Sequence, residues 1–170
     1  MNEQINNMDD AAQLVTFRLG QETYGIDIFK VQEVIHLQKI NSIPKSPNFV
    51  EGVIEVRNQI VPVINLKKRL GINEDGGYKQ RIVILDLRGQ LLGVVVDDIS
   101  KVIKLENKNY EILPDAVVGD RERACITCFA KTEEGLVIII SPERILSQGE
   151  KKALNDFEQI QMQEKVNNAS

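Results

Sequence analysis

Apolar and polar residues are patterned most clearly in residues 49–66, FVEGVIEVRNQIVPVINL. Two largely apolar runs, 53–56 and 60–64, flank the polar tripeptide Arg57-Asn58-Gln59. β-Branched residues suit a pleated strand, and asparagine tolerates the left-handed backbone angles of a tight turn. The pattern therefore predicts a β-hairpin that displays Arg57 at its tip.

Pro62 and Gly52 add two details to this hairpin. Proline cannot donate a ladder hydrogen bond, so the second strand is expected at a sheet edge or with a bulge. Gly52 enters the hairpin without a side chain, which fits a bend or the close approach of another backbone.

The remaining pattern predicts further strands and several short helices. Alternation favours strands at 13–19 and 23–28, and helical spacing of apolar residues predicts a short helix or helical turn over FKVQEV, residues 29–34. The run KKRLG predicts one helical turn closed by Gly71. Residues 141–146 predict a short helix that starts with Pro142. A C-terminal helix and tail is expected over 147–170, with Leu154, Phe157 and Ile160 on one side.

The second half of the chain repeats the first at a shift of 68 residues. Nine positions agree in type, including a glycine in the second strand: 17/85, 19/87, 24/92, 25/93, 26/94, 28/96, 31/99, 34/102 and 35/103. Residues 63–65 resemble 138–140 at a longer shift, which predicts an insertion within 105–120. The repeat predicts two similar β modules packed face to face, at 13–72 and 78–146, with NEDGG (73–77) as the linker.

Composition narrows the class of protein. The 170 residues are 42% hydrophobic and 27% charged, which suits one core or two small ones. A net charge of −4 argues against nucleic acid or an anionic membrane surface as the main partner. No apolar run approaches the roughly 20 residues of a membrane span, and the polar segment 1–12, expected to be disordered, lacks a signal-peptide pattern. We expect a cytoplasmic protein.

Candidate catalytic and metal-binding residues are few. His36 is the single histidine. Cys125 and Cys128 form a CxxC motif, but zinc requires two further ligands, and residues three apart on a strand face opposite ways. Two buried structural cysteines are the preferred interpretation. The basic run 67–69 is expected on a solvated face, and no glycine-rich phosphate loop is present. We therefore expect no catalytic residue, metal or cofactor, and no enzyme.

Three motifs resemble the CheW family, the adaptors of bacterial chemotaxis arrays. They are YGIDIFKVQEVI (24–35), IPKSPNFVEGVIEVRNQIVPVINL (43–66) and LGVVVDDISKVI (92–103). The resemblance runs from about Gln13 to Leu146, which defines a CheW-like domain over 13–146. The family usually has Arg-Gly at the hairpin tip, where this chain has Arg57-Asn58. Asparagine is the next best residue for positive φ, so the turn is expected to survive.

The resemblance implies a mainly β fold of two SH3-like five-stranded barrels that share a hydrophobic seam. It also implies a non-enzymatic adaptor that links chemoreceptor cytoplasmic tip helices to the regulatory domain of the histidine kinase CheA. Receptor-binding positions would be Val15, Ile28, Val31, Glu33, Val34, Gly52, Arg57 and Gly93, with Val15, Ile28 and Val34 in an apolar groove for a receptor helix. Arg81 and Ile82 match positions that meet the kinase. Recruitment to membrane-associated receptor arrays is expected, without direct membrane insertion.

Two other classes remain open. The chain could be the coupling domain of another two-component signalling complex that works with a separate receiver protein. An enzyme would differ by a deep pocket with convergent titratable groups, whereas an adaptor would show shallow apolar grooves rimmed by charge.

Overall fold

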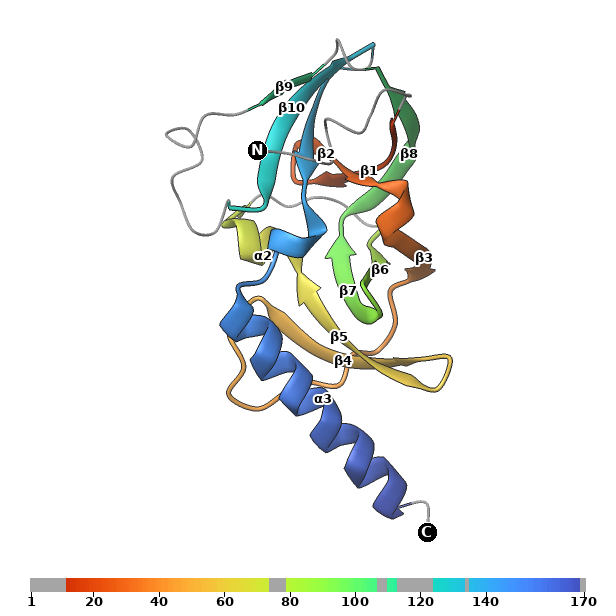
Figure 1. Cartoon of the computed structure of the whole chain (residues 1–170), viewed down its shortest axis with the longest axis vertical. Helices are drawn as coiled ribbons and strands as arrows, with labels where there is room; N and C mark the ends of the chain where they lie inside the picture. Colours follow the sequence, from red (N-terminus) through yellow and green to blue (C-terminus); the bar gives the residue numbers. More distant parts are fainter. Residues whose placement is uncertain (1–11, 74–78, 107–109, 113–123, 134, 169–170) are drawn as a thin grey trace.

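The computed structural model describes residues 12–73, 79–106, 110–112, 124–133 and 135–168, so the predicted disordered segment 1–12 and the linker 73–77 lie almost wholly outside it. The described chain is built mainly of strands (Figure 1). They are β1 Ala12–Leu19, β2 Glu22–Asp27, β3 Val31–His36, β4 Val50–Val56, β5 Gln59–Asn65, β6 Arg81–Leu87, β7 Gln90–Val96, β8 Asp98–Leu105, β9 Tyr110–Ile112, β10 Ile126–Thr132 and β11 Gly135–Ile140. The helical elements are η1 Ile28–Lys30, α2 Leu66–Leu70, η4 Pro142–Arg144 and α3 Gln148–Asn168.

The strands form two sheets, and each sheet draws on both halves of the chain. Sheet 1 has the order β8-β1-β2-β11-β10-β9, and sheet 2 has the order β3-β6-β7-β5-β4. The mainly β fold with two packed modules is thus confirmed. The division into consecutive modules at 13–72 and 78–146 is wrong, because β3 leaves the first hairpin for sheet 2 and β8 leaves the second hairpin for sheet 1.

The 68-residue repeat survives in the register of the two sheets. Thr16 pairs with Gly25 as Ile84 pairs with Gly93, so the two glycines occupy equivalent places, as predicted. The exchanged strands obey the same shift, since Val31 of β3 faces Leu85 and Ile99 of β8 faces Phe17. The repeat therefore describes two equivalent sheets that have exchanged one strand each, β3 and β8.

The end of each repeat is also equivalent, at a corrected shift. Val63 of β5 faces Gly93, and Ile139 of β11 faces Gly25, both in parallel pairing. The shift is therefore 76 residues, one more than residues 138–140 suggested. β9 is the sixth strand of sheet 1 and lies within the predicted insertion at 105–120. In sheet 2 the equivalent place beside β4 is taken by the isolated bridge of Asn41 with Val53.

The main core lies between the two sheets. Phe17 and Tyr24 of sheet 1, with ring centroids 6.3 Å apart, share one buried cluster with Val83 and Leu85 of sheet 2. Ile145, at the end of η4, is completely buried in the same cluster. Each such side chain contributes about 1.5–3 kcal/mol of hydrophobic stabilisation, so the sheets are held together by a common interior.

The helical predictions are partly confirmed. α2 ends at Gly71 with a φ of 70°, and η4 begins with Pro142, both as expected. The helix predicted over 29–34 is wrong beyond Lys30, because Val31–His36 forms β3 with alternating burial. A bulge between Val31 and Glu33 shifts the strand's period and mimics helical spacing in the sequence. α3 is present over 148–168, where the side chains of 157 and 160 lie outside the described set.

Pro62 does not mark an edge strand. β5 lies between β7 and β4, and the bulge in this hairpin falls between Val50 and Gly52. The parallel ladder with β7 starts only at Val63, so Pro62 needs no donor on that side.

The basic run of α2 does not form the predicted solvated face, because each cation has a carboxylate partner. Lys67 Nζ lies 3.0 Å from Asp97, Lys68 Nζ lies 2.9 Å from Glu51, and Arg69 lies 2.9 Å from a Glu150 oxygen. The sequence alone predicts a solvated face because the partner carboxylates are distant from the run in sequence.

Asp97 is the most buried of these carboxylates, at 1% exposure. It stands where the chain passes from β7 into β8. Its Oδ2 accepts a 2.8 Å hydrogen bond from Gly20 N, and its own N donates to Arg18 O at 3.0 Å. Together with Lys67 these contacts tie the β1–β2 turn, α2 and the strand crossing together.

We expect Asp97→Asn to lower the free energy of unfolding by about 2–3 kcal/mol, because a largely buried ammonium loses its carboxylate while the Gly20 hydrogen bond keeps an acceptor. Lys68→Gln, which removes an exposed pair with Glu51, is the matched control and should cost less than about 1 kcal/mol. Urea unfolding measures both. Equal small losses would show that Asp97 does not lock the crossing.

Candidate functional site

The β4–β5 hairpin tip has the geometry that its sequence predicted. Val56 pairs with Gln59, which leaves a two-residue turn in which Arg57 and Asn58 have φ values of 49° and 66°. Two consecutive positive φ angles are the signature of a type I′ turn, and asparagine suits the second position. The Arg57 side chain is 75% exposed. A stiff turn thus presents the guanidinium to solvent.

Glu33 of β3 meets this arginine. Arg57 Nη2 lies 3.2 Å from Glu33 Oε2, so these two predicted receptor-binding residues form an ion pair, with Glu33 on a strand and not on the predicted helical turn. The other oxygen, Oε1, is buried and has no hydrogen-bond partner among the described residues. Because the arginine is exposed, the pair is worth only about 0.2–1 kcal/mol and serves orientation more than stability.

Gly52 lies where another backbone passes very close. Its φ is 141°, and a Cβ built on it would lie 2.0 Å from Asn41 O. Asn41 and Val53 exchange two backbone hydrogen bonds of 2.9 and 2.8 Å, so the segment after β3 joins the edge strand β4. Gly52 is therefore required by the closure of sheet 2.

Gly93 and Val15 are also buried. A Cβ on Gly93 would lie 3.1 Å from both Ile82 and Val63, at the point where β5 and β7 pair. Val15 is 7% exposed, between Ile26 of β2 and Val102 of β8. Both residues can shape a binding surface but offer a partner almost no side-chain area.

Among the described residues, three of the five exposed large apolar side chains lie on η1 and the exchanged strands, while Leu37 follows β3 and Leu136 lies on β11. Asp27 Oδ1 caps η1 by accepting from Phe29 N at 3.0 Å, and the Phe29 side chain projects with 87% exposure. Val34 of β3 and Val102 of β8 are 39% and 51% exposed. Ile28 and Val31 are half-buried beside them in the chain. Figure 1 places β8, η1 and β3 along one side of the molecule.

The sequence missed Phe29 and Val102. Val102 could have been found, because it is the 68-residue equivalent of Val34 on the other exchanged strand. Phe29 carries no sequence signal of exposure, since it opens the segment for which the sequence predicts a short helix or helical turn.

Arg81 and Ile82 are the first two residues of β6, and their side chains differ in exposure to solvent. Arg81 is half-buried, and its Nη1 donates to the backbone oxygens of Lys79 and Gln80, both at 3.1 Å. Ile82 is completely buried in the core of sheet 2. The inward-facing register of β6 places the Ile82 side chain in the interior, so the prediction of kinase binding at Ile82 stays a prediction that the side chain could serve only through the position of β6.

The comparison with protein families agrees with this architecture. The family model described as the CheW-like domain matches residues 13–150. The chain belongs to the CheW family. It is accordingly a chemotaxis coupling adaptor.

Relatives and a solved structure show the same family. The chemotaxis protein CheW of Treponema pallidum is 39% identical over 65% of this chain and 68% of its own length. That of Klebsiella aerogenes is 31% identical over 81% of this chain and 83% of its own. The crystal structure of the scaffolding protein TtCheW from Thermoanaerobacter tengcongensis matches with a TM-score of 0.72 and 36% identity, over 84% of this chain and 93% of that one.

The alternative of a coupling domain that works with a separate receiver is not favoured. Chemotaxis protein CheV3 of Helicobacter pylori is 24% identical over 69% of this chain, and the match spans 38% of that protein.

The candidate catalytic and metal-binding residues of the sequence are His36, Cys125 and Cys128. His36 is exposed at the end of β3. Cys125, in the turn before β10, and Cys128, within β10, are free buried thiols, and burial raises the pKa of Cys125 to about 11. Within the described residues, no group of three or more His, Cys, Asp or Glu is placed to hold a metal ion.

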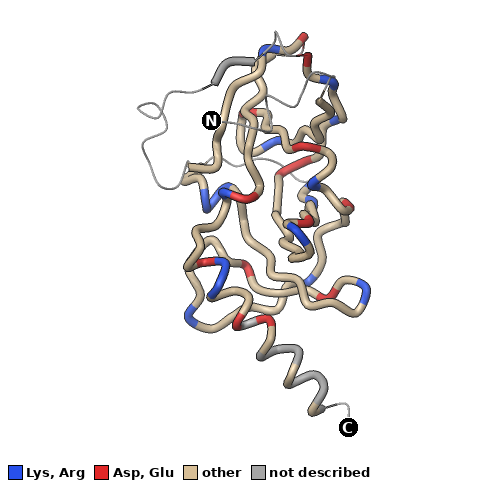
Figure 2. Tube along the Cα trace, in the orientation of Figure 1, with Lys and Arg blue, Asp and Glu red and all other residues tan. Residues whose placement is uncertain are grey.

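Nor does any helix in that part of the chain have the length and apolar character to cross a membrane. Cations and carboxylates are mixed over the described trace (Figure 2).

We expect Gly52→Ala to lower the free energy of unfolding by about 3 kcal/mol or more, since the added methyl meets the Asn41 backbone at an unfavourable φ. Gly89→Ala is the matched control, because Gly89 has a φ of 89° but open space around its Cβ position. It should cost only the backbone term of about 1–2 kcal/mol. Chemical denaturation compares them, and equal losses would remove close packing as the reason for Gly52.

Proposed function

We propose that this adaptor binds a chemoreceptor cytoplasmic tip at η1 and β3, and the regulatory domain of CheA at the start of β6. The observation that carries the proposal is the exposure of the apolar side chains of Phe29 and Val34 on η1 and β3, the strand that also carries Glu33 of the Glu33–Arg57 pair. Large exposed apolar side chains rimmed by charge are typical of protein interaction sites. The proposed activity is coupling without catalysis.

The receptor surface combines an apolar strip and a charged rim. Ile28, Phe29 and Val34 would contact one face of a receptor helix, in the helix-in-groove mode of recognition. Val31 packs partly against the main core and supports the strip from below. Gly52 and Gly93 hold the strands that carry the strip and the hairpin, so substitutions there would disturb binding through the fold.

The kinase surface is proposed at Arg81, beside the end of β3. Its cross-strand partner there is His36, which is exposed. Ile82 contributes by fixing the register of β6 from inside. Binding of the receptor would recruit the adaptor to membrane-associated receptor arrays, without insertion of its own.

Val34→Asp tests whether the two surfaces are separate. The carboxylate would be desolvated under an apolar receptor helix at a cost of several kcal/mol, against about 8 kcal/mol for a micromolar complex. Receptor-tip binding should be lost, and kinase binding should stay within about twofold. Arg81→Glu should give the reverse pattern.

Isothermal titration of each variant against a receptor-tip fragment and the CheA regulatory domain measures these effects. Circular dichroism checks that each variant is folded. Substitution at Val34 should disturb the fold less than substitution at Val31, because Val34 is more exposed. Loss of both partners in either folded variant would contradict separate surfaces.

The Glu33–Arg57 pair makes a second test. Glu33→Arg and Arg57→Glu should each weaken receptor-tip binding, because each places like charges together at the rim. The double variant restores an opposite pair and should recover most of the lost affinity. If the double variant binds no better than the single ones, the two residues do not act as a pair.

A further inference from the structure

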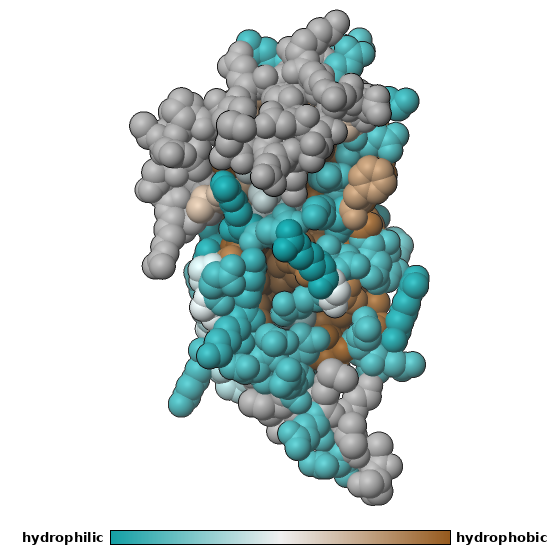
Figure 3. Space-filling model, in the orientation of Figure 1, coloured by the Kyte–Doolittle hydropathy of each residue, from teal (hydrophilic) through white to brown (hydrophobic). Residues whose placement is uncertain are grey.

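A groove separates α3 from the β6–β7 hairpin, and its Glu143 end adjoins η1 through the Lys30–Glu143 ion pair. A cavity of about 360 Å³ is joined to a second of about 350 Å³ by the shared lining residues Arg88, Gln90 and Leu91. We call the joined cavities the α3 groove. Its apolar floor consists of Pro62, Leu91, Leu92, Leu146 and Leu154. An apolar hollow between hydrophilic rims is visible on this face in Figure 3.

The wall formed by α3 is held in place from behind. Arg69 donates two 2.9 Å hydrogen bonds to the Glu150 carboxylate and one of 2.9 Å to Ile145 O, and it lies 4.7 Å from the centre of the Phe49 ring. Ser147 and Glu150 exchange the reciprocal bonds of a capping box at the helix start. Leu154 is buried. The groove is thus preformed, which lowers the entropic cost of binding.

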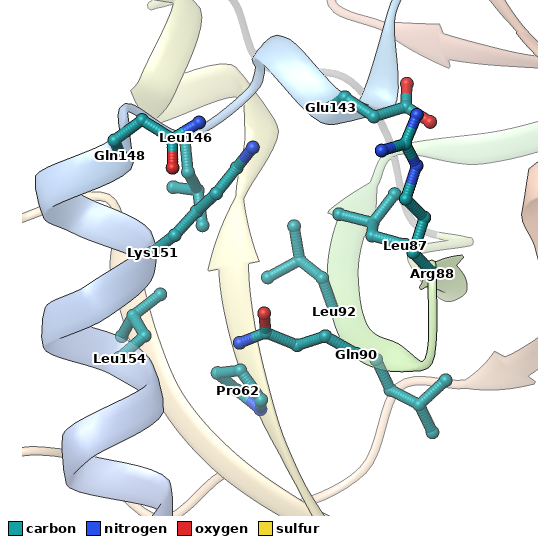
Figure 4. Close-up of a pocket in the computed structure, with 11 residues that line it drawn as sticks. Pro62, Leu87, Arg88, Gln90, Leu92, Glu143, Leu146, Gln148, Lys151 and Leu154 are labelled. Atoms are coloured by element: carbon teal, nitrogen blue, oxygen red, sulfur yellow. The ribbon is translucent and has the colours of Figure 1, made fainter.

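The two walls carry complementary polar groups. Lys151 and Gln148 on α3 point toward the hairpin, from which Gln90 reaches back across the floor (Figure 4). Arg88 stands at the hairpin tip of the same groove. Among the described residues, neither Lys151 nor Arg88 makes an ion pair, and Glu143, which also lines this end, is engaged by Lys30 at 2.7 Å. This end therefore favours an added carboxylate.

The far end differs in charge. Glu158 lines the second cavity together with Asn155, Gln59 and Ile60. Arg88 lines both cavities, so the charge that distinguishes this end is the Glu158 carboxylate, which disfavours a second ligand carboxylate beside it. The carboxamides of Gln90 and Gln148, on opposite walls, offer both hydrogen-bond donors and acceptors. These groups match a peptide backbone better than an acyl chain.

We propose that the α3 groove binds a short peptide segment of a partner protein, in which apolar side chains are followed by a carboxylate. The apolar side chains would cover Leu87 and Leu91, which are half-buried, and would lie against the edges of the buried Leu92 and Leu154. The carboxylate would lie between Arg88 and Lys151, with the carboxamides of Gln90 and Gln148 on the peptide backbone. This site is additional to the receptor and kinase surfaces proposed above and does not depend on them.

Two matched probes test the site: a fluorescein-labelled hexapeptide of four leucines and two C-terminal glutamates, and the same peptide with two lysines. Fluorescence anisotropy gives the affinity, and amide chemical shifts of the full chain give the location. The glutamate peptide should bind saturably, shift Gln90, Lys151 and Leu154, and bind at least about tenfold more tightly than the lysine peptide.

Charge variants decide the contacts. Arg88→Glu and Lys151→Glu should each weaken the glutamate peptide by about tenfold, whereas Lys152→Glu, an exposed neighbour outside the lining, should leave it unchanged. Arg88 has a φ of 57°, and glutamate adds no new strain because it also carries a Cβ. Lys151→Gln gives a milder variant in case a second glutamate beside Glu150 perturbs the capping box.

Each remaining outcome bears on the proposal. Saturable binding that survives Val34→Asp but falls in the groove variants supports it. Absence of binding at millimolar peptide, equal binding of both peptides, or shifts confined to η1 and β3 would overturn it. Binding of phosphatidylglycerol vesicles in place of the peptide, lost in the same variants, would replace it with a membrane contact.

Discussion

β3 and β8 each leave the hairpin that precedes them and pair with the hairpin of the other half. Neither sheet is complete without both halves, and the main core is made of residues from both. Separation of the sheets would therefore break backbone ladders as well as expose apolar surface. The two crossing points, at η1 and at Asp97, are the positions on which the packing of everything else depends.

The two crossings are equivalent by the 68-residue shift, yet they carry opposite chemistry. Position 97 holds a buried carboxylate that locks the crossing to Gly20 and Lys67, while the equivalent position 29 holds a phenyl ring that is 87% exposed. An exposed phenyl group adds nothing to the stability of the isolated fold. The crossing at Asp97 thus stabilises the fold, whereas the crossing at η1 leaves apolar area available to a partner.

Local pattern was sufficient for the features that depend on neighbours in sequence. The Arg57-Asn58 turn, the αL cap at Gly71 and the equivalence of Gly25 with Gly93 all follow from short-range chemistry or from the repeat. Strand exchange could not be predicted, because exchanged and unexchanged sheets give the same 68-residue repeat. Likewise the burial of Ile82 and the ion pairs of α2 depend on contacts that only the folded chain brings together.

The proposed receptor and kinase surfaces are connected by one ladder. Val34 pairs with Val83, and His36 pairs with Arg81, so both surfaces lie along the antiparallel pairing of β3 with β6. Backbone hydrogen bonds hold these strands in register, and the buried side chains of β6 fix them from below. The exposed Glu33–Arg57 pair is too weak to transmit force by itself. A displacement imposed at Val34 would therefore reach Arg81 through the ladder as a rigid movement, which is the mechanical property a coupling adaptor requires.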